Sequence, residues 1–137
     1  MPFRLEFDAT HRILLISCDG VFSDDDLADG YSALRDCSKT HGPFSCIVDY
    51  TGVTKFTVSS QAVINLAHME PTIPVDYLQI NVTPKTAYFG MARMFQILTS
   101  ESRPNLRVVS TMKEAYLMLG VASPSYSPVE YKLRKRK

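Results

Sequence analysis

The stretch Asp49-Tyr-Thr-Gly-Val-Thr-Lys-Phe-Thr-Val-Ser-Ser60 decides how this chain is expected to fold. It continues the apolar run Phe44–Val48, which predicts a short strand that ends at the acid Asp49. A polar loop follows, and the two serines stand where a helix begins. Open α/β sheets place their binding sites at the carboxyl ends of strands. We therefore expect a site formed by the polar residues of the stretch and its glycine: Asp49, Thr51, Gly52, Thr57, Ser59 and Ser60.

The residues before this stretch predict a hairpin and a helix. Phe3–Phe7 alternates apolar and polar side chains, and Ile13–Cys18 is a more continuously apolar strand. The connection between them is short, which favours an antiparallel hairpin. Ser23 then opens a helix as its N-cap, with Asp26 at the capping-box position, and His41-Gly42-Pro43 ends that helix.

After the stretch, helices and strands alternate with short connections. The pattern predicts a helix at about 59–69, a strand at 77–82, a helix at 83–100, a strand at 106–109 and a helix at 111–120. Such alternation indicates a mainly parallel sheet with helices on its faces. We therefore predict one α/β domain, with a five-stranded mixed, mainly parallel sheet, an antiparallel N-terminal hairpin and four helices.

Composition and charge divide the chain into a body and a tail. The 137 residues are 45% hydrophobic, which is typical of one soluble globular domain. We expect this domain to span residues 1–121 and a loose basic tail to span residues 122–137. The formal charge of the whole chain is +1, yet the tail carries the basic cluster Lys132–Lys137. A solvated end is the favoured interpretation of that cluster, so no nucleic-acid partner is expected.

Cysteine usage and hydropathy indicate a cytoplasmic protein. Cys18, Cys37 and Cys46 form no close pair and no zinc-site spacing, so we expect buried, reduced thiols. The N-terminus has no apolar signal core, and no apolar run approaches the length of a membrane span.

The sequence holds no motif for catalysis, a cofactor or a metal. It has no dinucleotide fingerprint, no phosphate-binding Gly-rich loop and no nucleophile elbow. His68 follows Ser60 by about two helical turns, roughly 12 Å, which is too far for a base to activate that serine. The acidic run Asp24–Asp26 favours helix capping over metal binding. We therefore predict a protein that is not an enzyme and has no cofactor and no metal.

Two features leave alternatives open. Ser59 or Ser60 could accept a phosphoryl group at the start of a helix, although the residues alone favour an N-cap. The helix that holds Tyr88, Met91 and Arg93 could present a second surface to a partner or ligand, because methionine-rich surfaces adapt to varied shapes. The alternative is a helix that faces the core, with Arg93 on its wet side.

The chain resembles the STAS superfamily, the fold of bacterial anti-sigma-factor antagonists, and also small bacterial STAS/CRAL-TRIO-like proteins of unassigned role. The resemblance covers about residues 3–121 and rests on the order of elements and on the segments Val48–Phe56, Tyr88–Phe95 and Arg107–Gly120. It implies a STAS-like domain that acts without catalysis as a regulatory or protein-interaction module. Lipid or small apolar ligand binding and an uncharacterised enzyme are the alternatives, and a homodimer is left open.

In the regulatory members of that superfamily, a serine directly after an aspartate at this helix start is phosphorylated by a partner kinase. Ser59 and Ser60 are present here, while Thr57 stands in place of the acid and Gln61 in place of a glycine. The resemblance therefore implies a protein partner that docks at the loop and helix after the third strand.

Overall fold

The computed structural model describes residues 3–84 and 87–131. The strands in this part of the chain are β1 (Phe3–Asp8), β2 (Ile13–Phe22), β3 (Ser45–Phe56), β4 (Gln79–Val82), β5 (Leu106–Val109) and β6 (Ser127–Val129). The helices are α1 (Asp24–His41), α2 (Ser60–Ala67), α3 (Ala87–Leu98) and α4 (Met112–Leu119).

The strands form one mixed sheet in the order β5-β4-β3-β2-β1-β6. β2, β3, β4 and β5 are parallel, and β1 pairs antiparallel with β2. The predicted α/β fold, with its antiparallel hairpin and four helices, is therefore confirmed. The predicted number of five strands is wrong, because Ser127–Val129 pairs antiparallel with Leu5–Phe7 and makes a sixth strand. A three-residue segment with Pro128 at its centre is too short to show the alternating pattern that indicates a strand.

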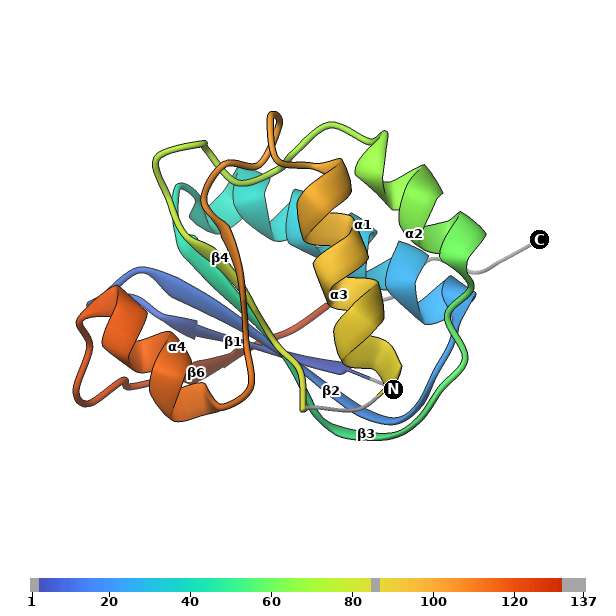
Figure 1. Cartoon of the computed structure of the whole chain (residues 1–137). Coiled ribbons are helices and arrows are strands. Elements are labelled where there is room, and N and C mark those ends of the chain that lie inside the picture. The colour runs from blue at the N-terminus through green and yellow to red at the C-terminus, as the bar shows by residue number, and fades with distance from the viewer. Residues whose placement is uncertain (1–2, 85–86, 132–137) are drawn as a thin grey trace.

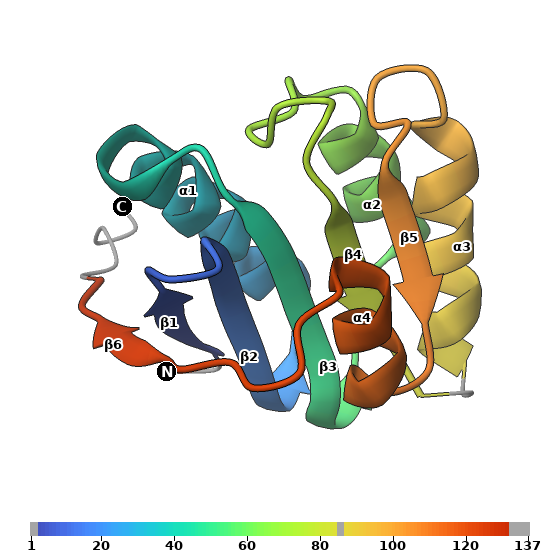
Figure 2. The same ribbon diagram turned by 90° about the vertical axis from the view of Figure 1, so that its left-hand side faces the viewer.

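The helices cover the two faces of the sheet unequally. Helices α1, α2 and α3 lie on one face, and α4 lies on the other (Figure 1, Figure 2). Alternate residues of the central strands supply the two resulting cores, because successive side chains of a strand point to opposite faces. Leu14 and Cys46 belong to the core under the three helices, whereas Leu15 and Ile47 belong to the core under α4.

The segment after α4 is anchored to the hairpin by a buried carboxylate. Asp8 is fully buried and accepts hydrogen bonds from the backbone N–H groups of His11, at 2.8 Å, and Ser125, at 2.9 Å. Burial acts to raise the pKa of Asp8, but these bonds and the contact with the His11 ring outweigh it and lower that pKa from 3.8 to about 2. The hydroxyls of Tyr116 and Tyr126 lie 2.6 Å apart nearby.

These contacts involve part of the segment that is expected to be a loose tail. Within it, Ser127–Val129 pairs with β1. The basic cluster Lys132–Lys137 lies outside the described residues. The expected domain limit at residue 121 stays a prediction.

The third strand is longer than the sequence pattern predicts. It ends at Phe56 instead of Asp49, so most of the expected loop is strand. β2 is extended in the same way to Phe22 and pairs with this extension through two register shifts. Gly20 lies at one shift with a φ of +67°, a conformation that favours glycine. Because β4 stops at Val82, which pairs with Asp49, the extension runs past the end of β4.

Candidate functional site

The corner between β3 and α2, residues 57–60, is held in place by hydrogen bonds to the end of β2 and to the start of α1. Thr57 donates through its backbone N–H and its hydroxyl to the carbonyl oxygen of Phe22, at 2.9 and 3.2 Å. Ser59 is the N-cap of α2, and its hydroxyl oxygen accepts a hydrogen bond from the Ala62 N–H at 3.1 Å. This confirms that Ser59 caps the helix, as the residue type predicts.

Asp24 joins the two helices at this corner. Its carboxylate accepts hydrogen bonds from the Ser59 N–H at 2.6 Å and from the Ser59 hydroxyl at 2.9 Å. Asp24 is also the first residue of α1, whose predicted capping box between Ser23 and Asp26 is present. The carboxylate therefore lies close to the positive ends of both helix dipoles, which attract its negative charge.

The corner is open to solvent while its centre is anchored. Thr57, Ser59 and Ser60 are exposed, whereas Val58 is buried in the core under α1, α2 and α3. Ser60 is the first residue of α2. A buried anchor between exposed hydroxyl groups gives a surface with a fixed shape that another molecule can reach.

The structure does not bring the remaining predicted residues to this corner. Asp49, Thr51 and Gly52 lie within β3, and Asp49 is separated from Phe56 by about 20 Å of strand. The Asp49 carboxylate accepts a hydrogen bond from the Thr51 N–H at 2.9 Å. The expectation of a single loop fails here because the polar residues 50–56 continue the strand and pair with β2.

Gly52 has a packing role in this part of the sheet. A Cβ atom at this position would lie 2.3 Å from Asp19 Oδ1 and 2.9 Å from the Cys18 carbonyl oxygen. Asp19 in turn forms an ion pair with Arg4 on β1. The glycine therefore allows the Asp19 side chain to lie against the β3 backbone.

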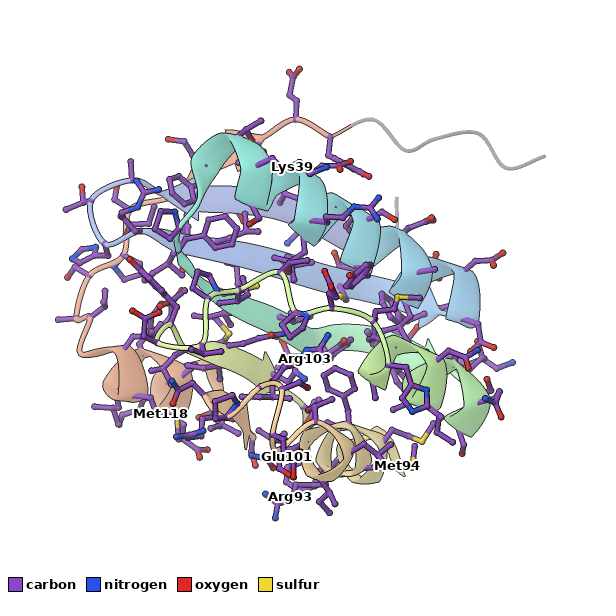
Figure 3. The ribbon with its side chains drawn as sticks, turned by 90° about the horizontal axis from the view of Figure 1, so that it is seen from above. Lys39, Arg93, Met94, Glu101, Arg103 and Met118 are labelled. Atoms are coloured by element: carbon purple, nitrogen blue, oxygen red, sulfur yellow. The ribbon has the colours of Figure 1, made fainter. Side chains whose placement is uncertain are left out.

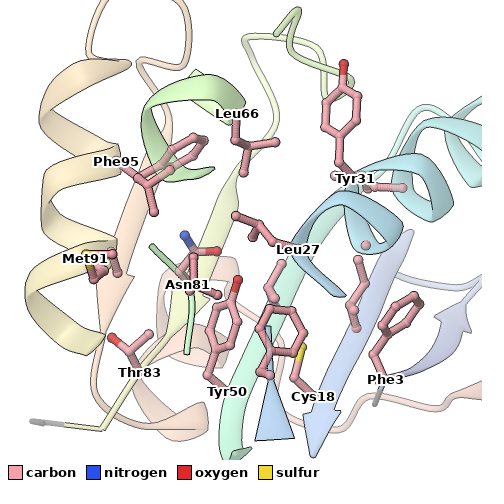
Figure 4. Close-up of a pocket in the computed structure, with 18 of the residues that line it drawn as sticks. Phe3, Cys18, Leu27, Tyr31, Tyr50, Leu66, Asn81, Thr83, Met91 and Phe95 are labelled. Carbon is pink, nitrogen blue, oxygen red and sulfur yellow. The ribbon is translucent and has the colours of Figure 1, made fainter. Parts of the chain in front are cut away.

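The second predicted surface is divided between the two sides of α3. Arg93 is exposed and donates a hydrogen bond to Gln96 Oε1 at 2.9 Å. Met91 is half-buried and lines a cavity inside the molecule (Figure 4). The side chain of Tyr88 lies outside the described part of the structure. Arg93 and Met91 therefore do not form one surface.

The cavity that Met91 lines was not predicted. It has a volume of about 100 Å³ and lies between the sheet and the helices α1, α2 and α3. Apolar side chains form most of its wall, and the polar groups in it include Tyr50, Asn81, Thr83 and Arg103. The sequence signal that could have indicated the cavity is the pair of polar residues Asn81 and Thr83. They are two positions apart, so their side chains face the same side of the sheet. The volume is below the few hundred Å³ that a lipid would need.

Burial shifts the pKa of two of these polar groups but leaves their charge at neutral pH unchanged. Burial raises the pKa of the Tyr50 hydroxyl, so Tyr50 stays a neutral donor. Burial lowers the pKa of Arg103, which remains charged because an arginine titrates far above neutral pH. The guanidinium of Arg103 donates to the Met69 carbonyl oxygen at 3.0 Å and lies 5.1 Å from the centre of the Phe95 ring.

Comparison with known proteins identifies the fold. No protein-family model matches the sequence, and no curated protein matches it. A solved structure of the Bacillus cell fate determinant SpoIIAA in the phosphorylated form is similar, with a TM-score of 0.53 and 17% identity. The match covers 85% of this chain and 98% of that chain. In the described residues, no helix has the length and apolar character to cross a membrane. The resemblance that the sequence indicates is confirmed at the level of the fold: this chain has a STAS-like α/β architecture.

Proposed function

We propose that this chain is a non-catalytic regulatory module that docks a protein partner through the corner at residues 57–60 and the adjoining helix α2. The observation that carries the proposal is the exposed Ser59, whose side chain is fixed by Asp24 and by the Ala62 N–H. A surface that is already rigid loses little conformational freedom when a partner binds, which favours recognition. The likeness of the fold to a cell fate determinant supports a regulatory role.

The similar SpoIIAA structure is that of a phosphorylated form, which motivates a phosphoryl switch at this corner. Of the two serines here, we propose Ser60 as the acceptor. Ser60 is exposed at the start of α2, where the helix dipole favours negative charge. The Ser59 hydroxyl lies 2.9 Å from a carboxylate oxygen of Asp24, so a phosphoryl group on Ser59 would be repelled. Ser59 then holds the corner, and Ser60 carries the modification.

Site-specific crosslinking in the native host tests the docking surface. A photo-crosslinking residue replaces Thr57 or Ser60 in two chains, and exposed Lys113 on α4 in a control chain. We expect one protein to be crosslinked from both corner positions and not from position 113. The same protein captured equally from position 113, or no protein captured from the corner, would contradict the proposal.

The cytoplasmic location and the homodimer stay predictions. Cell fractionation can check the first, and sedimentation of the purified protein can check the second.

A further inference from the structure

The cavity between the sheet and the helices α1, α2 and α3 carries an inference that is independent of the docking corner. Its polar wall includes Tyr50 on β3, Asn81 on the neighbouring strand β4, and Thr83, which follows β4. Figure 4 shows Tyr50 and Asn81 close together, with Thr83 on the same side of the cavity. Among the described residues, the Thr83 hydroxyl is buried without a hydrogen-bond partner.

A polar group such as the Thr83 hydroxyl is costly to bury without a partner. Thr83 is 2% exposed and Asn81 is 7% exposed, so bulk water does not reach them freely. A buried hydroxyl or amide that lacks a hydrogen bond costs about 1–3 kcal/mol. Buried polar groups in native proteins are almost always satisfied, by the protein, by water or by a ligand. The polar wall therefore indicates that the cavity is occupied by something that accepts or donates hydrogen bonds.

A buried positive charge lies on the same cavity. Arg103 is 8% exposed and lines the cavity wall. It belongs to the loop that follows α3 (Figure 3), and its guanidinium donates to the Met69 carbonyl oxygen just after α2. One of its nitrogens, Nη1, is buried without a hydrogen-bond partner, and none of the ion pairs in the described residues includes Arg103. Buried charges are normally paired, so this site favours an anionic occupant.

We propose that this cavity binds a small carboxylic acid. Its apolar part would lie against Leu66, Met91 and Phe95, which line the cavity. Its carboxylate would accept hydrogen bonds from the polar wall, in the positive potential of Arg103. Tyr50, Asn81 and Thr83 all carry donors, which fits a group that can only accept. The volume of about 100 Å³ limits the molecule to roughly five to seven non-hydrogen atoms, because a cavity of about 150 Å³ holds one benzene. A whole lipid does not fit inside this volume.

Protein-observed NMR with isobutyrate as the probe tests the proposal directly. The methyl groups of Leu66 and Met91 report on the cavity, and those of Leu117 and Met118, which are exposed on α4, serve as internal controls. Isobutyramide has the same shape without the charge. We expect saturable shifts at Leu66 and Met91 with isobutyrate, and binding of isobutyramide at least about tenfold weaker. Equal binding of the two probes, or no saturable shift with isobutyrate because the cavity holds only water, would overturn the proposal.

Paired variants locate the binding. Thr83→Val removes the unpartnered hydroxyl and keeps the side-chain shape, so it should weaken isobutyrate binding about tenfold without loss of stability. Thr99→Val is the matched control, because Thr99 is as buried but its hydroxyl donates to the Phe95 carbonyl oxygen at 2.7 Å. Thr99→Val should leave isobutyrate binding unchanged.

Arg103→Lys should retain isobutyrate binding and Arg103→Met should lose it. If Arg103→Met does not fold, the threonine pair still decides, since unchanged binding in Thr83→Val would overturn the proposed site.

Discussion

Ser59 illustrates, at the scale of single residues, how one side chain can fix a surface. Its hydroxyl oxygen caps α2 and its proton is donated to Asp24, so both hydrogen-bonding functions are used inside the chain. The N-cap could be predicted from the sequence, because serine before an apolar helical pattern has a known local role. The bond to Asp24 could not, since it joins residues 35 positions apart. Only the packing of α1 beside α2 creates it.

We predict that Ser59→Ala lowers the free energy of unfolding by about 1 kcal/mol, because the cap of α2 is lost. Ser60→Ala is the matched control, and it should change stability by less than about 0.5 kcal/mol because that side chain is exposed. Urea unfolding of both variants measures the difference. Equal stability of the two variants would show that the contacts of Ser59 do not hold the corner.

A second residue-scale prediction concerns the glycines. Gly52→Ala should destabilise the protein by about 1–3 kcal/mol, because the new Cβ meets Asp19 and the Cys18 carbonyl oxygen. Gly90→Ala should stabilise it by up to about 1 kcal/mol, because Gly90 lies in α3 with open space around the added atom. Thermal unfolding compares the two. A neutral Gly52→Ala would mean that the Asp19 side chain simply moves aside.

At the scale of elements, the sequence predicted regular alternation well and irregular pairing poorly. The order of helices and strands up to α4 follows from hydrophobic period and capping residues. The extension of β3 to Phe56 was missed because its exposed threonines and lysine resemble a loop. Its pairing depends on the equally long β2, and such a distant partner has no local signature.

The sixth strand leads to a prediction about truncation. A chain of residues 1–121 loses β6, the bond from Ser125 to Asp8 and the contact between Tyr116 and Tyr126. We expect it to fold, because most of both cores lies before residue 122, but to be less stable by about 2 kcal/mol or more. The exposed edge of β1 should also cause association that depends on concentration.

A chain of residues 1–131, which keeps β6, is the control for that truncation. Urea unfolding and sedimentation velocity compare the two chains. If residues 1–121 are as stable and as monodisperse as residues 1–131, then the segment after α4 contributes nothing to the fold, and the predicted domain limit at residue 121 is supported.

At the scale of the whole molecule, Asp8 couples the hairpin to the segment after α4 and makes stability depend on pH. Its pKa is lowered from 3.8 to about 2 in the folded chain, so its contribution is present above pH 3.8 and is lost as the pH falls toward 2. Asp8→Asn should lower the stability at pH 7 by about 1–3 kcal/mol and flatten the profile between pH 4 and 2. Urea unfolding at a series of pH values measures this, with exposed Asp76→Asn as control. Parallel profiles for the wild type and Asp8→Asn would refute the coupling.

The cavity also belongs to the whole molecule, which explains why the sequence did not predict it. Its wall combines side chains from β3, β4, α3 and the loop before β5, and none of these segments has a binding motif. The sequence therefore indicated the STAS-like fold and the corner serines, whereas Arg103 and Asn81 acquire a shared environment only through the assembled sheet and helices.

The most direct test of the central claim is the dissociation constant of the partner captured at the corner, measured for the wild type, Ser60→Asp and Ser123→Asp. Ser123 is exposed in the segment after α4, so its substitution controls for added charge alone. We predict that Ser60→Asp weakens binding at least about tenfold, equivalent to about 1.4 kcal/mol, while Ser123→Asp binds like the wild type. Wild-type affinity in Ser60→Asp, or an equal loss in both variants, would contradict a charge-sensitive docking surface at the start of α2.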